Sequence, residues 1–112
     1  MVEDAAELFR AIADPTRLRI LHLLRSGELC VGDLVTVLRV PQPTASRHLT
    51  ALRKAGFVAA RKHSYWTFYA LVPARTGLRR KLLDCLDADK IGRSRDQKRL
   101  DAVRRHGGCC PM

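Results

Sequence analysis

The sequence lacks several features that would place the protein in other classes. No run of about 18 apolar residues occurs, and Glu3 and Asp4 interrupt the N-terminus, so we expect neither a membrane-spanning helix nor a signal peptide. No Cys-x-x-Cys pair opens a helix, and no Ser/His/Asp or paired-carboxylate constellation accompanies a plausible pocket. These absences predict a cytoplasmic protein and give an enzyme, such as a thiol reductase, little support.

Size and charge narrow the class further. The length of 112 residues allows one domain with one modest core and leaves no room for a second, catalytic domain. Hydrophobic residues make up 46% of the chain, so we expect it to fold. Lys and Arg number 21 against 11 Asp and Glu, a net charge of +10. Such a field attracts polyanions, of which nucleic acid is the commonest, although charge alone leaves acidic membrane surfaces open.

The first part of the chain predicts a series of helices. Residues 2–13 carry apolar side chains at helical spacing, which is typical of an amphipathic helix. Asp14 places a capping oxygen before Pro15, so a second helix is predicted to begin there and to end at Ser26-Gly27. A third, shorter helix is predicted from Val31 to Leu38, because apolar residues recur within it and a proline closes the segment.

The stretch from Pro41 to Gly56 predicts a helix with one apolar face and one basic face. Counted at 100° per residue, its apolar residues Ala45, Leu49 and Leu52 fall in one narrow arc. Arg47 and Lys54 lie on the opposite side, which suits phosphate oxygens and base edges, although a merely solvated basic face is the simpler alternative. The predicted DNA-contacting residues of this helix are Gln42, Thr44, Ser46, Arg47, His48 and Lys54.

Beyond Gly56 the pattern changes from helical to alternating and predicts a β-hairpin. Its strands are expected at residues 57–61 and 65–71, with a turn at residues 61–64 that lacks glycine. The two preceding helices, joined by a tight connection, have the sequence logic of a helix-turn-helix, so the hairpin would be its wing. We expect Arg61 and Lys62 at the basic tip to reach phosphates, and the aromatic residues of the second strand to serve packing rather than base stacking.

Two more helices are predicted after the hairpin, at residues 74–87 and near residues 95–105. The last one has few apolar residues and would be marginal alone, so it must lean on the rest of the protein. The first helix of the chain and the stripe from Leu78 to Leu86 expose more apolar surface than so small a fold can cover, which favours a symmetric dimer.

The expected fold is therefore mainly α with a β-hairpin, a winged helix-turn-helix that forms a homodimer. We expect residues 1–92 to form the DNA-binding and dimerisation domain. Residues 93–112 would form a C-terminal helix and a flexible, cysteine-containing tail.

Four stretches of the sequence, within about residues 5–73, carry a family resemblance: AIADPTRLRILHLL, GELCVGDL, VPQPTASRHLTALRKAGFV and YWTFYALVP. Together they resemble the ArsR/SmtB family of winged-helix metalloregulatory repressors. The resemblance implies a homodimer that binds double-stranded operator DNA and leaves it when a metal or metalloid ion binds. In arsenic-sensing members the third helix typically reads Glu-Leu-Cys-Val-Cys-Asp-Leu. Here Cys30 matches the first cysteine but Gly32 stands at the second, so the usual arsenic site is broken.

The remaining candidate ligands for an inducer are thiols. Zinc-type sites of the family use Asp, His and Glu near the C-terminus, but residues 74–87 contain no histidine, and we expect Asp84 and Asp87 to be solvated. Trivalent arsenic and antimony bind two or three thiolates instead. The predicted metalloid ligands are Cys85, Cys109 and Cys110, with Cys30 as the alternative ligand. For Cys85 and Cys30, simple packing is the competing interpretation.

The arrangement of these thiols follows from a distance. If the last helix folds back along the one before it, the tail lies roughly 18 Å from Cys85 of its own subunit. Cys85 of the partner subunit would then complete the site with Cys109 and Cys110. The expected function is a repressor released from its operator by trivalent arsenicals, namely arsenite, methylarsenite or antimonite. The alternative is a winged-helix repressor whose cysteines sense oxidants or sulfide rather than a metalloid.

Overall fold

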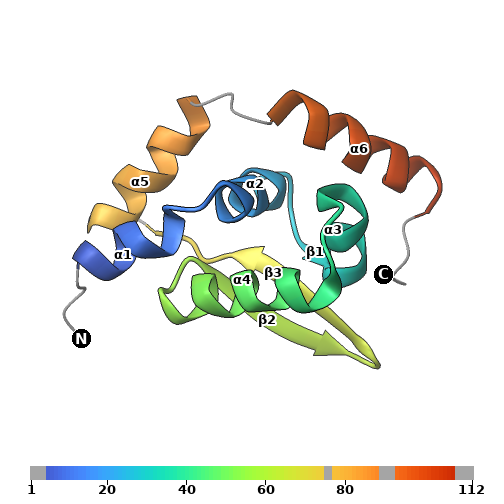
Figure 1. The fold of residues 1–112 in the computed structure, drawn as a ribbon, viewed down its shortest axis with the longest axis horizontal. Coiled ribbons are helices and arrows are strands. Elements are labelled where there is room, and N and C mark those ends of the chain that lie inside the picture. Colours follow the sequence, from blue (N-terminus) through green and yellow to red (C-terminus); the bar gives the residue numbers. More distant parts are fainter. Residues whose placement is uncertain (1–4, 75–76, 89–92, 108–112) are drawn as a thin grey trace.

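The computed structural model describes residues 5–74, 77–88 and 93–107, and Figure 1 shows how its elements are arranged. In chain order these are α1 (Ala5–Ile12), α2 (Pro15–Leu24), β1 (Leu29–Cys30), α3 (Val31–Leu38), α4 (Gln42–Lys54), β2 (Val58–His63), β3 (Trp66–Leu71), α5 (Gly77–Ala88) and α6 (Arg93–Arg105). This order confirms the predicted mainly α fold with a β-hairpin. Within these ranges, no helix combines the length and the apolar character that crossing a membrane requires.

Local signals set the helix boundaries around the helix-turn-helix, which consists of α3 and α4. Asp14 Oδ1 accepts hydrogen bonds from the backbone N–H groups of Thr16 (2.8 Å) and Arg17 (3.2 Å), so α2 begins at the predicted cap. α3 spans the predicted residues and ends at Arg39, whose φ of 58° is left-handed. Residues 39–41 then turn the chain into α4.

One hydrophobic core holds the helices together. Ala45, Leu49 and Leu52 of α4 are fully buried, which confirms the predicted inward face of that helix. α2 lies at the centre of the core and buries every residue from Ile20 to Leu24. The core also receives side chains from α1, α3, α5 and α6, so the elements that carry the helix-turn-helix are fixed from several sides.

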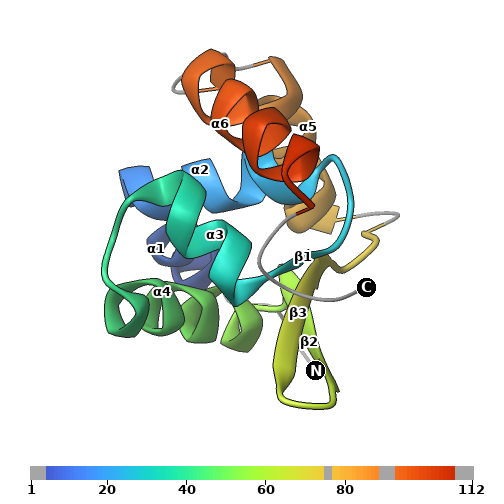
Figure 2. The same ribbon diagram turned by 90° about the vertical axis from the view of Figure 1, so that its right-hand side faces the viewer.

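The last helix takes a different path from the one considered in the sequence analysis. α6 packs on α2 and α3, with Leu100 fully buried, and Figure 1 shows it next to these helices, separated from α5 by the linker that precedes it. Figure 2 shows the same molecule turned by 90°. It therefore finds the support that its weak apolar pattern required. Because it does not fold back along α5, the condition behind the distance argument for a two-subunit thiol site is not met.

The sheet has three antiparallel strands in the order β1-β3-β2, one more than the hairpin predicted. β1 is the unexpected strand and has only two residues, with Leu29 opposite Tyr69 and Cys30 opposite Phe68. The hairpin closes with His63 opposite Trp66, which leaves a two-residue tip at residues 64–65. The predicted turn at residues 61–64 was therefore wrong by about two residues, and both Arg61 and Lys62 lie within β2.

The tip needs no glycine because Ser64 itself adopts a left-handed conformation, with a φ of 58°. Phe68 is buried and Trp66 and Tyr69 are half-buried, so the expectation that the aromatic residues of this strand serve packing is confirmed for these three. Tyr65 differs, since it lies at the tip and is 99% exposed. The wing thus ends in an aromatic side chain that contributes nothing to the core.

Candidate functional site

The outer face of α4 presents polar and basic side chains, as the sequence predicted. Gln42, Arg47 and Lys54 are exposed, and Thr44 and Ser46 are half-buried beside them. The opposite face of the helix is anchored in the core, so these side chains are held on a rigid element. Guanidinium, ammonium, amide and hydroxyl groups in this arrangement can donate hydrogen bonds to base edges and phosphate oxygens.

His48 was predicted to contact DNA, but the structure places it on the inner side of α4. Its side chain is 9% exposed, and its Nδ1 accepts a hydrogen bond from Arg17 Nε at 3.0 Å. Arg17 also donates to the backbone carbonyl oxygens of Arg10 (3.4 Å) and Ala11 (3.3 Å), so it joins the end of α1 to α4. His48 lies four residues before Leu52, and this helical spacing was the signal that could have placed it inward.

The wing carries its basic residues differently from α4. Arg61 donates from Nε (2.8 Å) and Nη2 (2.6 Å) to the two carboxylate oxygens of Glu28. Its guanidinium carbon also lies 4.8 Å from the centre of the Phe68 ring, the residue opposite it on β3. These hydrogen bonds lower the pKa of the Glu28 carboxyl below its ordinary value. Arg61 is thus occupied by an internal partner, whereas the neighbouring Lys62 is exposed.

A cleft between α4 and the wing joins the two basic surfaces. It is lined from α4 by Gln42 and Ser46, from the wing by Tyr65, Trp66, Thr67 and Tyr69, and from the start of α3 by Val31 and Gly32. In Figure 2, α4 and the hairpin extend on the same side of the molecule, away from α6. The outer face of α4, the cleft and the wing therefore form one continuous candidate nucleic-acid interface, to which sequence reasoning did not assign Tyr65.

Cys30 is the most buried of the cysteines that the structure describes. It is 1% exposed, ends β1 and packs against Phe68 and Trp66. Its Sγ also accepts a hydrogen bond from the backbone N–H of Asp33 at 3.4 Å, so it caps the N-terminus of α3. The sulfur is disulfide-bonded.

The other predicted metalloid ligands are only partly described. Cys85 on α5 is exposed and carries a free thiol, so it does not pack within the core of the chain. Cys109 and Cys110 lie outside the described residues. Among the residues that are described, no three His, Cys, Asp or Glu side chains lie close enough together to hold a metal ion. Cys85 alone cannot supply the two or three thiolates that trivalent arsenic takes, so a metalloid site at Cys85 requires further sulfur from Cys109, Cys110 or a second copy of the chain.

Comparison with known proteins connects this architecture to a family. The model of the bacterial regulatory protein arsR family matches residues 14–60, which run from the α2 cap to the first wing strand. An uncharacterized HTH-type transcriptional regulator of Methanocaldococcus jannaschii is 51% identical over 73% of this chain and 93% of its own length. The arsenical resistance operon repressor of Escherichia coli K12 is 46% identical over 70% of this chain and 68% of its own length.

Solved structures agree with this result. Reduced HlyU from Vibrio cholerae N16961 superposes with a TM-score of 0.64 at 35% identity, over 73% of this chain and 83% of HlyU. The family match covers the helix-turn-helix and the start of the wing. The chain therefore belongs to the ArsR family, and it is a transcriptional repressor with a winged helix-turn-helix rather than an enzyme.

Proposed function

We propose that this repressor is released from its operator by a trivalent arsenical bound to cysteine thiolates. The observation that carries the DNA-binding part is the rigid outer face of α4, where Arg47 is exposed. This helix and the wing extend on the same side of the molecule (Figure 2). Arg47 would bond a guanine edge, whereas Lys54 and Lys62 would bond phosphates. The inducer is inferred from the similarity to the arsenical resistance operon repressor, and from a chain that offers thiols while its described residues form no cluster of His and carboxylate side chains.

A second copy of the chain completes the DNA-binding unit in this proposal. Two recognition helices must enter successive major grooves about 34 Å apart, which a single copy cannot do. The apolar surface for pairing would come from α1 and α5: Phe9 is 52% exposed, and Leu78 and Leu82 are only half-buried. Leu82→Glu should therefore yield monomers in analytical ultracentrifugation. A soluble dimer that keeps wild-type operator affinity would place the interface elsewhere.

Cys85, Cys109 and Cys110 are the proposed ligands, with Cys30 as the alternative. Thiolates bind trivalent arsenic in a pyramid, and adjacent thiols lower the entropy cost of closing the chelate. Whether the sulfurs come from one subunit or two, the bound ion causes release only if it binds more tightly to a state that no longer fits the operator. The affinity difference between the two states is the free energy available for derepression.

The test is an operator-release titration with a panel of inducers. The reduced chain on a fluorescent operator duplex should release DNA with arsenite, methylarsenite or antimonite, but not with Zn²⁺. Serine variants at positions 85, 109 and 110 should bind DNA normally and resist arsenite, whereas Cys30→Ser should still respond. If Cys30→Ser abolishes the response and the tail can be deleted without effect, Cys30 is the sensor instead. If no thiophilic ion releases the DNA, the arsenical proposal is wrong.

A second candidate, a repressor that responds to oxidants, is favoured by one observation, the disulfide bond of Cys30. In the cytoplasm a disulfide is unusual unless it forms and breaks during function. Oxidation of two thiolates by hydrogen peroxide would form the S–S bond, pass two electrons to the peroxide and leave water. Reversible release of the operator by peroxide and its recovery with dithiothreitol, without any response to arsenite, would select this function over the first.

A further inference from the structure

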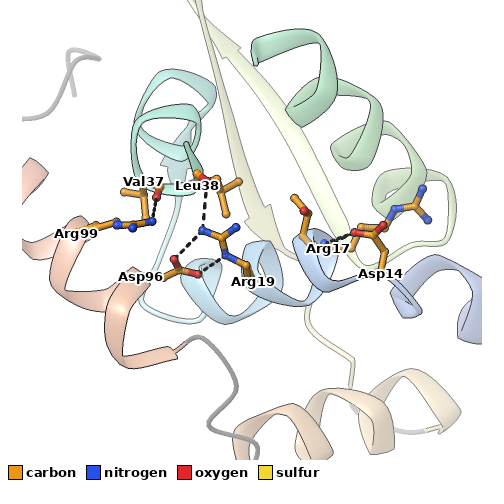
Figure 3. Close-up of polar contacts among 8 residues, drawn as sticks. Asp14, Arg17, Arg19, Val37, Leu38, Asp96 and Arg99 are labelled. Carbon is orange, nitrogen blue, oxygen red and sulfur yellow. Dashed lines mark hydrogen bonds and ion pairs between the residues drawn. The ribbon is translucent and has the colours of Figure 1, made fainter. Parts of the chain in front are cut away.

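A buried carboxylate on α6 is the feature of the fold that the proposed function leaves unused. Asp96 is 2% exposed, although α6 is otherwise strongly polar. Figure 3 shows its two carboxylate oxygens facing the guanidinium of Arg19 on α2. Arg19 donates from Nε to Oδ2 at 2.8 Å and from Nη2 to Oδ1 at 2.9 Å. This is a two-pronged ion pair between segments 77 residues apart in the sequence.

The ion pair also reaches the C-terminus of α3. Arg19 Nη2 donates a further hydrogen bond to the carbonyl oxygen of Leu38 at 3.2 Å, and Arg99 Nη1 on α6 donates to that of Val37 at 3.3 Å. Carbonyl groups in the last turn of a helix have no partner within it. The helical partner of the Val37 carbonyl would be the N–H of residue 41, but that residue is a proline and has none.

These two carbonyls lie at the start of the turn into the recognition helix. Residues 39–41 connect α3 directly to α4, and Arg39 already adopts the left-handed conformation that ends α3. The position of the last turn of α3 therefore sets where α4 begins. The guanidinium groups of Arg19 and Arg99 hold this last turn of α3, and α6 positions both of them. Arg19 is held through its ion pair with Asp96, and Arg99 is itself a residue of α6.

Charge makes the arrangement depend on Asp96. Desolvation, and then the neighbouring cations Arg39 and Arg95, lower the pKa of Arg99, while Asp96 acts in the opposite direction. The hydrogen bond to Asp96 likewise raises the pKa of Arg19. Loss of this carboxylate would leave several guanidinium groups crowded at the end of α3 without the negative charge that holds them together.

We infer that Asp96 is a positioning residue for operator binding: through Arg19 it fixes the C-terminal turn of α3 and thereby the placement of α4 in the DNA groove. The contact does not touch DNA. This role of Asp96 rests on operator binding by the repressor and does not depend on which inducer releases the repressor from DNA. The last helix thus acts as part of the DNA-reading apparatus, in addition to covering the core.

The test compares two carboxylates of the same helix in the full chain. Asp96→Asn removes the buried charge, and Asp101→Asn, whose carboxylate is exposed and bonded only to Gln97 among the described residues, is the matched control. Affinity is measured by fluorescence anisotropy on a duplex selected by the wild-type chain from a random library, and on a scrambled duplex. We expect Asp96→Asn to lose roughly ten-fold in affinity for the selected duplex and little for the scrambled one, because phosphate contacts survive. Asp101→Asn should match wild type on both.

Two further variants separate positioning from simple loss of stability. Asp96→Glu keeps the charge and should recover most of the affinity for the selected duplex. Arg99→Met leaves the ion pair intact but frees the Val37 carbonyl, so it should weaken selected binding by a smaller factor while remaining folded. All measurements are made well below the melting temperature of each variant, as determined by circular dichroism. Hydrogen exchange at residues 39–46 should accelerate in Asp96→Asn but not in Asp101→Asn.

Three results would overturn the inference. Asp96→Asn could keep wild-type affinity for the selected duplex while its melting temperature falls, which would make the ion pair purely structural. Asp96→Asn could lose affinity for both duplexes equally, which would point to general disruption of the fold. If Asp96→Asn does not fold, Arg99→Met with wild-type affinity for the selected duplex would decide against the inference. A wild-type chain that selects no duplex would refute operator binding itself, an outcome distinct from the other two.

Discussion

The outer face of α4 and the wing are both basic, but their arginines are held in opposite ways. Within the part of the chain that the structure describes, Arg47 on α4 is exposed and makes no hydrogen bond or ion pair. Arg61 on β2 gives two hydrogen bonds to Glu28 and rests on the Phe68 ring. The guanidinium donors of Arg47 are therefore available to a ligand, whereas those of Arg61 are already bonded within the chain. Net charge alone would have treated the two surfaces as equivalent.

The largest effect expected from this difference is at Arg47. Arg47→Ala should cost on the order of 1–3 kcal/mol of operator binding and should relax base preference, because a bidentate guanidinium contact reads a base edge. The measurement is anisotropy on the operator and on duplexes with single base changes. Equal losses on operator and random DNA would show that Arg47 contacts only the backbone, and the contrast with the wing would then disappear.

His48 provides the next test, since it lies next to Arg47 in sequence but faces inward. His48→Ala should reduce the free energy of unfolding by about 1–2 kcal/mol, because it removes the acceptor for Arg17 Nε and leaves a small cavity. Base preference on the operator duplex should stay unchanged. Urea denaturation followed by circular dichroism gives the first quantity and anisotropy the second. A stable variant with altered base preference would return His48 to the DNA-contacting set.

A smaller and more uniform effect is expected for Lys62 on the wing. Lys62→Ala should weaken operator and random DNA by similar factors and reduce the slope of log affinity against log salt by about 0.9, the value of one phosphate contact. Titrations at several salt concentrations measure this slope. An unchanged slope would mean that the wing makes no phosphate contact through Lys62.

The smallest effect is expected when Arg61 is freed. Glu28→Gln removes the charge that holds Arg61, so random DNA should bind slightly more tightly and the salt slope should steepen by about 0.9 if the guanidinium moves to a phosphate. Both side chains are partly exposed, so solvent screens the pair and folding stability should change little. A slope identical to wild type would show that Arg61 remains on the wing surface.

Protonation of Glu28 at low pH should have the same effect as Glu28→Gln. The direction of this pH dependence follows from the lowered pKa of the Glu28 carboxyl. A carboxyl whose pKa is depressed in the folded state contributes its stabilisation fully above its ordinary value of 4.5 and loses it as pH falls through the lower folded value. The pair is therefore intact at neutral pH. The salt slopes of wild type and Glu28→Gln should differ at neutral pH and converge only below pH 4.5.

Sequence reasoning succeeded where the signal was local. The limits of α3 and the inward residues of α4 were predicted correctly because caps, proline and helical spacing lie within a few residues of one another. β1 could not be predicted because two residues have no periodicity, and the strand exists only because β3 offers partners 38 to 40 positions away. The position of the hairpin tip was predicted wrongly because the left-handed residue there is Ser64, whereas a glycine would have marked the turn in the sequence.

For the candidate site, the sequence predicted the exposure of individual residues but not the contacts between residues far apart in the chain. The exposure of Gln42 and Arg47 follows from helical spacing. The pairing of Arg61 with Glu28 was not predictable in the same way, since it joins positions 33 apart that meet through strand register. Asp96 likewise reads in sequence as one more charge on a polar helix, and only the packing of α6 on α2 reveals it as buried.

The register of the small sheet connects the buried Cys30 to an exposed residue of the wing. Cys30, Phe68 and Arg61 stand opposite one another on three neighbouring strands, and opposite residues share a face of a sheet. Cys30 packs against Phe68, and the guanidinium of Arg61 lies over the Phe68 ring. A change of volume at this sulfur would therefore act first on Phe68 and then on Arg61, so this row of side chains connects the interior of the protein to the exposed surface of the wing.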